Sequence, residues 1–404
     1  MCLDEATIDT NMLISQTKLK KLINDLIPLA ELSVMADSNI NQLTELSQGN
    51  VNQVFRVILE NGFSFIAKYA PPFAYRYQEI AINSQRNCFE AEVLKHLAKA
   101  KKDAYPEVYY FSNQQHLMLM EDLNDCLVMR DALIEGDVFE HFKVQAVEMF
   151  KQYADNIPDS ETVQRTTISY QEGIFELQEI TRLFVFECPF GLDYPNGICM
   201  LEGHHSWIKH NIFDNTQLQA ARTRLQEIYN TKHEALIHGD LHTGSIMLNH
   251  NKMKVIDPEF AKIGPISFDI GMLLANLLMN LIASNYHLKN DRSKQANFQL
   301  WLSDSISYIY HQSIKALADL GFDVLQLKAE IIGFCAIEII RRTIGAVQIK
   351  DFLSINSLKS RQSIEKIALM LALEQLSVTQ EVLTIEASLA LVSKLVATEL
   401  DFDV

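Results

Sequence analysis

The chain has 404 residues, of which 48% are hydrophobic and 21% charged, as in a packed globular protein. This length exceeds what one hydrophobic core usually serves, so two lobes are expected. The formal net charge of −16 disfavours nucleic acid and anionic membranes as partners, because an acidic surface repels phosphate groups.

Cysteine usage and the N-terminus point to a reducing compartment. The six cysteines form no Cys-x-x-Cys pair, which favours free thiols. Asp4 and Glu5 stand where a secretory signal would need basic residues. The apolar stretch 266–283 contains one aspartate and two asparagines, which favours a central helix of a large lobe. We therefore expect a cytoplasmic protein without a membrane span.

The first 120 residues carry the strand signals. Asn61-Gly62 separates two β-rich runs, Val51–Glu60 and Phe63–Tyr69, and this dipeptide strongly indicates a hairpin because both turn positions need positive φ. A further short buried strand is expected at Leu117–Met120. Helical spacing of apolar residues predicts two helices in this part, at 12–36 and 84–99.

Beyond about residue 125 the pattern becomes mainly helical. Two short strands, Ser245–Leu248 and Met253–Ile256, interrupt it, and long helical patterns follow at 266–283, 296–320, 326–348 and 360–398. The sequence thus predicts an α+β fold with two lobes. A small antiparallel-sheet N-lobe (1–120) and a hinge (121–124) precede a larger, mainly helical C-lobe (125–404). Ligand sites favour such domain junctions.

The segment His238–Ser245 is the first candidate for phosphoryl-transfer chemistry. It is a loop with two glycines, two histidines and one carboxylate, Asp240. Kinase catalytic loops place a metal-binding asparagine five residues after the catalytic aspartate, and Ser245 occupies that position here. The alternative is a turn in which Asp240 caps a helix. We predict that Asp240 is catalytic and Ser245 a metal ligand.

A second pair of carboxylates follows on Asp257 and Glu259, beginning seventeen residues after Asp240 (240 to 257). A short hairpin joins the two segments and would return these groups to the same cleft. Carboxylate oxygens suit Mg²⁺, so Asp257 is the predicted main ligand and Glu259 the second. A solvated turn after a strand is the alternative.

Lys68 lies on the second hairpin strand and shares a face with Ile66, because side chains alternate along a strand. A lysine there can reach the α- and β-phosphates of ATP, while Ile66 would pack on adenine. Its ion-pair partner would be a glutamate of the next helix, Glu90 or alternatively Glu92. Considered alone, Lys68 could equally be an exposed strand lysine.

Three further segments complete the predicted site. Asn50 and Asn52 lie in a short loop that would cover the phosphates, although it holds one glycine. Glu121 and Leu123 would offer backbone groups to adenine from the hinge, which could also be a plain connector. Arg341-Arg342 lies inside an apolar helical pattern, where arginines need anionic partners. They either meet surface carboxylates or face the cleft and bind substrate.

The run His238-Gly239-Asp240-Leu241-His242-Thr243-Gly244-Ser245-Ile246 resembles the signature of 5-methylthioribose kinases, within the aminoglycoside- and choline-kinase-like group. That wider group usually has proline and asparagine where this chain has Thr243 and Ser245. Asp257-Pro258-Glu259 is similar to the family's metal motif, and Ile340–Gly345 to its paired-arginine segment. The resemblance runs from about residue 45 to 355.

The resemblance implies a protein-kinase-like fold and a reaction. ATP would phosphorylate the 1-hydroxyl of the thiosugar 5-methylthioribose within methionine salvage, with Mg²⁺ as cofactor. Asp240 would orient that hydroxyl and accept its proton, while Arg341 and Arg342 would hold substrate hydroxyls and steady the moving phosphoryl group. The family also implies a homodimer.

Three rival functions are weighed against this one. A kinase of another small alcohol is one, but choline would need an aromatic cage and an aminoglycoside an acidic surface. Paired arginines facing the cleft would suit neither cation. A nucleotide-binding module without catalysis would be expected to lose Asp240, Asp257 or Lys68, which are all present. The spaced carboxylates also argue against a helical scaffold.

Overall fold

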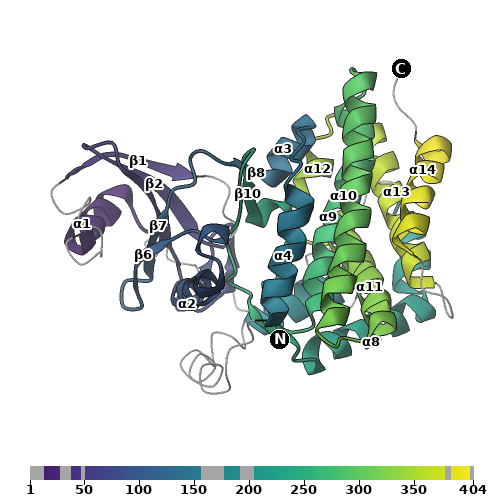
Figure 1. Ribbon diagram of the computed structural model, residues 1–404, viewed down its shortest axis with the longest axis horizontal. Helices are drawn as coiled ribbons and strands as arrows, with labels where there is room; N and C mark the ends of the chain where they lie inside the picture. Colours follow the sequence, from purple (N-terminus) through teal and green to yellow (C-terminus); the bar gives the residue numbers. More distant parts are fainter. Residues whose placement is uncertain are drawn as a thin grey trace. The chain divides into compact units, whose positions relative to one another are not determined.

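The computed structural model describes residues 13–27, 38–46, 51–155, 177–191, 204–377 and 384–400. The chain divides into two compact units (Figure 1). The first unit contains the described residues up to Asn124, Leu177, Gln178 and the segment Ile256–Glu259, and the second contains the other described residues. The predicted fold class, a small antiparallel sheet followed by a larger helical part, is confirmed.

The first unit is built on a five-stranded antiparallel sheet with strand order β1-β2-β3-β7-β6. Gly62 takes a φ of 83° in the turn between β2 and β3, so the predicted hairpin is confirmed, but Asn61 does not take the positive φ expected at both turn positions. The strands of this unit are β1 (Ile40–Leu46), β2 (Gln53–Leu59), β3 (Ser64–Tyr69), β4 (Phe73–Ala74), β5 (Tyr77–Ala81), β6 (Val108–Ser112) and β7 (Leu117–Glu121).

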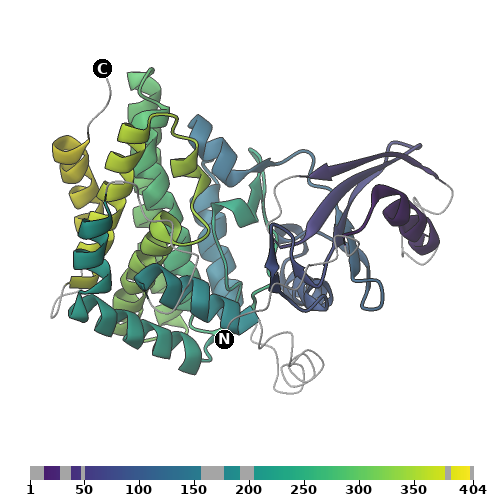
Figure 2. The ribbon, with the colours of Figure 1, turned by 180° about the vertical axis from the view of Figure 1, so that it is seen from behind.

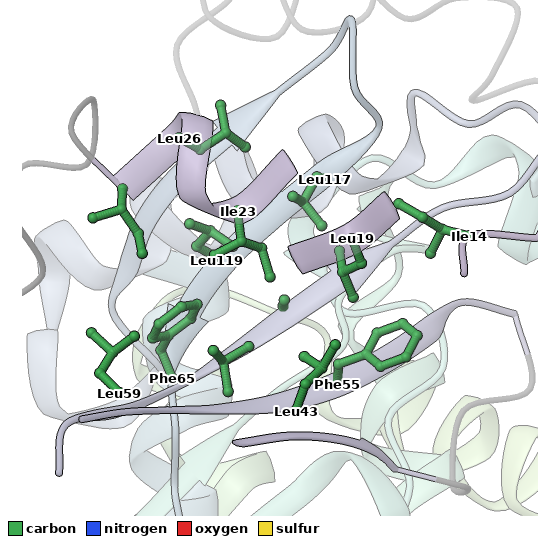
Figure 3. Close-up of a cluster of buried hydrophobic side chains, with 13 residues drawn as sticks. Ile14, Leu19, Ile23, Leu26, Leu43, Phe55, Leu59, Phe65, Leu117 and Leu119 are labelled. Atoms are coloured by element: carbon green, nitrogen blue, oxygen red, sulfur yellow. The ribbon is translucent and has the colours of Figure 1, made fainter. Parts of the chain in front are cut away.

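Two helices flank this sheet, α1 (Gln16–Leu26) and α2 (Arg86–Ala100). Helix α1 forms part of the predicted helix 12–36, of which residues 12 and 28–36 lie outside the described residues. Its buried residues repeat at four- and three-residue spacing and pack on one face of the sheet (Figure 3). That hydrophobic cluster includes Leu19, Ile23, Leu26, Phe55, Val57, Phe65, Ala67, Leu117 and Leu119.

The opposite face of the sheet carries the polar chemistry. Phe65 and Ala67 point into the α1 cluster, so Ile66 and Lys68 lie on the other face by strand alternation. Ile66 packs against a second cluster formed by Met118, Met120 and Ala91 of α2. The apolar residues of β3 thereby determine which way Lys68 points.

Because α1 seals one face of the sheet, shortening a side chain at its centre should destabilise the first unit. Ile23 is fully buried, and Ile23→Ala is expected to lower the free energy of unfolding by about 2–5 kcal/mol through lost burial and a cavity. Urea denaturation measures this change. Lys20→Ala on the exposed side of α1 is the control and should change stability by less than about 0.5 kcal/mol. Equal losses in both variants would contradict the packing role of α1.

The second unit is mainly helical, with three short strands in one sheet and two in another. Its strands are β8 (Leu127–Val128), β9 (Ala235–Ile237), β10 (Ile246–Leu248), β11 (Met253–Val255) and β12 (Lys262–Gly264). Its α-helices are α3 (Met129–Glu135), α4 (Phe142–Asp155), α7 (His205–Ile208), α8 (Thr216–Thr231), α9 (Ile266–His287), α10 (Arg292–Asp319), α11 (Val324–Ile344), α12 (Lys350–Leu353), α13 (Leu358–Ser377) and α14 (Ile385–Glu399).

The observed helices differ from the predicted ones in several bounds, with α9 ending at His287 and α10 beginning at Arg292, and in the division of one pattern. The pattern 360–398 contains two helices, α13 and α14, with residues 378–383 between them outside the described residues. Helix α11 ends at Ile344, before the predicted limit of 348, because Gly345 caps it in an extended conformation. Figures 1 and 2 show α9, α10 and α11 running side by side in the second unit.

Helix α9 lies at the centre of the second unit and contacts α11, α10, α13 and α3. Among the described residues it is the one helix long and apolar enough to cross a membrane, and its apolar window is wholly buried inside the protein. Its polar residues are paired: Asp269 with backbone amides, Asn276 with Glu338 and Asn280 with Asp351. The apolar stretch is therefore a core helix, as expected.

Candidate active site

The loop His238–Ser245 connects β9 to β10 in the second unit. The buried carboxylate of Asp269 accepts hydrogen bonds from the backbone N–H groups of His238 at 2.5 Å and Gly239 at 3.1 Å. Gly239 has a φ of 83°, and an added Cβ would lie 2.1 Å from the carbonyl oxygen of Phe260. Only glycine fits there, so the backbone leading into Asp240 is firmly fixed.

Asp240 is bound by both predicted arginines of α11. Its Oδ1 accepts hydrogen bonds from Nη1 of Arg341 and Nη2 of Arg342, each at 3.0 Å. Its Oδ2 lies 3.5 Å from Nε2 of His242. Burial alone would raise the pKa of Asp240, but the charges of Arg341 and Arg342 outweigh burial and hold that pKa well below its usual range. Asp240 is therefore ionised at neutral pH.

The two arginines pair with the partly buried Asp240 and with the buried Glu338, so the alternative of surface carboxylates does not apply. Glu338 lies one turn earlier on α11 and is fully buried. It accepts from Nη1 of Arg341 at 3.1 Å and from Nε of Arg342 at 2.7 Å. Glu338 was not among the predicted site residues, although its spacing of three and four residues before the arginines is that of helical ion pairs.

Ser245, the predicted metal ligand of the loop, is buried in a 3-10 turn (η8, Thr243–Ser245). Its Oγ lies 3.2 Å from the carbonyl oxygen of Asp240 and 3.1 Å from Nδ1 of His242. The same Nδ1 accepts a hydrogen bond from the N–H of Gly244 at 3.0 Å. Ser245 thus helps to hold the loop, and its role toward a metal stays a prediction.

In the first unit, Lys68 on β3 joins two of the predicted carboxylates. Its Nζ donates to Oε2 of Glu90 on α2 at 2.5 Å and also to the carboxylate of Asp257. The ion-pair partner on α2 is Glu90, and Glu92 is the alternative that the structure does not pair with Lys68. Lys68 and Glu90 are 5% and 1% exposed, so the pair is shielded from solvent.

The charges around Lys68 shift its pKa and those of its partners. Burial alone would lower the pKa of Lys68, but Asp257, Glu90 and Glu259 outweigh burial and raise it. Burial raises the pKa of Glu90 to about 8, with Lys68 opposing and Asp257 and Glu259 adding to the rise. Burial likewise raises the pKa of Glu259. Three carboxyl groups thus crowd around one ammonium, and the raised pKa values of Glu90 and Glu259 favour their protonated forms near neutral pH.

Glu259 is held by a chain of hydrogen bonds that the sequence did not reveal. Nδ2 of Asn52 donates to Oε2 of Glu259 at 3.0 Å, and Nε of Arg86 donates to Oδ1 of Asn52 at 2.8 Å. The other guanidinium nitrogens of Arg86 donate to backbone carbonyls, including those of Val51 at 3.0 Å and Pro71 at 2.8 Å. Arg86 therefore fixes the start of β2 beside Glu259. Asn50 lies outside the described residues.

The carboxylates of the first unit fit a magnesium ion that shares its ligands with a nucleotide. Among the described residues no group of three or more His, Cys, Asp or Glu side chains could hold a metal alone. Mg²⁺ is commonly held by one or two carboxylates together with substrate phosphates, which matches Asp257 and Glu259. Asp257 also has a φ of 69°, a conformation that clusters at functional sites.

Of the predicted hinge residues, Glu121 is the last residue of β7 and Leu123 follows two residues later. The N–H of Glu121 donates to the carbonyl oxygen of Glu107 at 2.8 Å, which leaves the Glu121 carbonyl as its candidate group for adenine. The side chain of Leu123 is 5% exposed. Arg56 pairs with Asp122 between them at 2.9 Å and fixes the local backbone.

Comparisons with known proteins address the family directly. Residues 200–287 match the model of the phosphotransferase enzyme family. The chain is 31% identical to a methylthioribose kinase of Bacillus mycoides over 345 residues, which cover 82% of this chain and 86% of that protein. It is also 30% identical to a methylthioribose kinase of Exiguobacterium sibiricum, over 81% and 85% of the two chains.

The chain belongs to the methylthioribose kinase family. The family resemblance predicted from the sequence is thereby confirmed, as is the enzyme class, a phosphotransferase. Among solved structures, an ethanolamine kinase of Plasmodium vivax aligns over 96% of this chain and 91% of its own, with 13% identity and a TM-score of 0.47.

The match to the phosphotransferase model covers four of the residues that the sequence singled out. The phosphotransferase region 200–287 contains Asp240, Ser245, Asp257 and Glu259. Asp269, Glu338 and Arg86 were not singled out, yet they hold the predicted residues in place. Asp269 stood out only as a charge within an apolar stretch, and Arg86 carries no sequence signal because most of its partners are backbone carbonyls.

Proposed function

We propose that this protein is an ATP-dependent kinase that phosphorylates the 1-hydroxyl of 5-methylthioribose. The products are 5-methylthioribose 1-phosphate and ADP, and the reaction belongs to methionine salvage. The observation that carries the proposal is the clamp of Arg341 and Arg342 on the ionised Asp240, in a chain of this family.

Asp240 orients the attacking hydroxyl. Its Oδ1 is occupied by the two arginines, so Oδ2 is the oxygen that accepts the hydrogen bond of the sugar hydroxyl. The low pKa of Asp240 makes it a weak base. A weak base suffices because the transition state of phosphoryl transfer is loose and the hydroxyl proton leaves late. Positioning is therefore the main contribution of Asp240.

Arg341 and Arg342 supply positive charge beside the reacting hydroxyl. Their guanidinium groups remain charged at any physiological pH and bind planar or multiple oxygen acceptors well. They hold substrate hydroxyls and stabilise the charge of the transferred phosphoryl group. Side-chain exposures of 11% for Arg341 and 4% for Arg342 strengthen such interactions, because little solvent screens them.

The first unit binds the nucleotide. Lys68, held by Glu90, contacts the phosphates, and Asn50 and Asn52 belong to the loop that covers them. Ile66 packs on adenine, and Glu121 and Leu123 offer it backbone groups from the hinge 121–124.

Asp257 and Glu259, with Ser245 as a third candidate, are the residues that hold Mg²⁺. The ion supplies positive charge that offsets the charge of the β- and γ-phosphates. We also infer a cytoplasmic homodimer from the family resemblance.

A substrate panel tests the proposal. The purified chain is incubated with ATP and Mg²⁺ and with methylthioribose, choline, homoserine or an aminoglycoside, and ADP release is measured. Methylthioribose is expected to be the preferred substrate. The ³¹P NMR spectrum of its product should show a phosphate bound to the anomeric carbon. Chelation by EDTA should abolish turnover and added Mg²⁺ should restore it. Turnover of another alcohol without turnover of methylthioribose would overturn the substrate assignment.

A further inference from the structure

Glu338 occupies an unusual position in the second unit. Its carboxylate is fully buried on α11 and accepts hydrogen bonds from three side chains. Oε1 accepts from Nε of Arg342 at 2.7 Å and from Nδ2 of Asn276 on α9 at 3.2 Å. Oε2 accepts from Nη1 of Arg341 at 3.1 Å. A buried carboxylate with this many donors is well compensated.

Consecutive residues of a helix point about 100° apart, so Arg341 and Arg342 do not converge by helical geometry alone. Glu338 provides the contact that brings the two guanidinium groups together. It lies three residues before one arginine and four before the other, and each of its two oxygens holds one of them. Both guanidinium groups then reach the single atom Oδ1 of Asp240, Arg341 with the same Nη1 that donates to Glu338 and Arg342 with its Nη2.

The network continues from Glu338 to the catalytic loop by a second route. Asn276 donates to Glu338 and accepts from Nη2 of Arg130 on α3 at 3.4 Å. Nε of Arg130 donates to Oγ1 of Thr243 in the loop at 3.3 Å and lies 3.8 Å from Asp351 on α12. Three guanidinium groups therefore balance three carboxylates, those of Asp240, Glu338 and Asp351.

We propose that Glu338 is a positioning residue that sets the two arginines against Asp240 and so determines how the sugar is held. This inference rests on the proposed function, since it explains how the substrate-binding arginines of that site are positioned. Glu338 itself touches no substrate. It acts through Arg341 and Arg342, whose guanidinium groups it orients by hydrogen bonds. Asn276 links the Glu338 carboxylate to α9.

Glu330 provides a matched control on the same helix. It lies two turns before Glu338, is 1% exposed, and pairs with Lys232 at 2.8 Å and with Oγ of Ser267 at 2.7 Å. Glu330 has the same chemistry and burial as Glu338 but other partners. A role limited to the stability of α11 would make the two carboxylates equivalent, whereas a positioning role would not.

The experiment compares Glu338→Gln with Glu330→Gln. Glutamine has nearly the same shape but places an N–H₂ group against one arginine and removes the charge that orients both. Glu338→Gln is expected to lower kcat/KM for the sugar by about 100-fold, the scale of a small misplacement of reacting groups. Its KM for ATP and its affinity for ADP should stay within about twofold, since the predicted nucleotide ligands belong to the first unit.

Glu330→Gln should lower the melting temperature but leave both KM values and kcat within about twofold. If Glu338→Gln does not fold, Asn276→Ala removes one donor to Glu338 while keeping both arginines, and a loss of about tenfold confined to sugar kinetics is expected. The inference would be overturned by equal kinetic constants in the two glutamine variants. It would also be overturned if Glu338→Gln raised KM for ATP as much as KM for the sugar. A wild-type chain inactive on methylthioribose would instead refute the proposed function.

Discussion

Asp240→Asn is expected to lower kcat by about 10³-fold, because it removes the charge that orients both the attacking hydroxyl and the two arginines beside the transferred phosphoryl group. Asparagine retains the shape of the side chain but cannot accept the hydroxyl proton, and it weakens the hold of Arg341 and Arg342. The affinity for ATP should change by less than about threefold, since the predicted nucleotide ligands are separate residues. Single-turnover assays and calorimetric titration with ADP measure the two quantities.

Glu365→Gln is the control for Asp240→Asn. Glu365 on α13 is a buried carboxylate that pairs with one arginine, Arg361, at 2.8 Å. This variant removes a buried charge from the second unit at another ion pair, so kcat should stay within about twofold. Retention of more than a tenth of wild-type turnover in Asp240→Asn would remove Asp240 from the catalytic role assigned to it.

Elements with strong local signals were predictable from the sequence. The β2–β3 hairpin was predictable because Asn61-Gly62 sits between two alternating runs. Burial alternates along β2 and along β3 as far as Ala67, where the buried Lys68 interrupts the pattern. Strand β1 was not predicted, because it buries only one residue, Leu43, and its pattern of apolar and polar residues resembles that of a loop. Strand β6 was not predicted either, since all its residues are half-buried and no face is distinguished.

The candidate site was predictable where its residues carry charge at characteristic spacings. Asp240, Asp257 and Lys68 have such spacings, and the structure brings Lys68 and Asp257 into contact as expected for a nucleotide site. The residues that hold these side chains and their loops in place were harder to predict from the sequence. Arg86 binds mostly backbone carbonyls, and Asp269 binds backbone amides, neither of which has a side-chain signature in the sequence.

Lys68→Met is expected to affect stability and activity together. It leaves the buried Glu90 without its cation, which should lower the free energy of unfolding by about 3–5 kcal/mol. It should also lower kcat/KM for ATP by about 100-fold, because the cation that we propose to contact the phosphates is lost. Lys95→Met, on the exposed side of α2, is the control and should leave kcat/KM for ATP unchanged.

The double variant Lys68→Met/Glu90→Gln separates the two effects. Removing the carboxylate as well abolishes the uncompensated charge, so denaturant unfolding should show most of the stability restored. The activity should remain as low as in Lys68→Met, because no group then contacts the phosphates from β3. A double variant that regained both stability and activity would mean that the buried pair only joins α2 to the sheet. Lys68 would then have no part in binding the nucleotide.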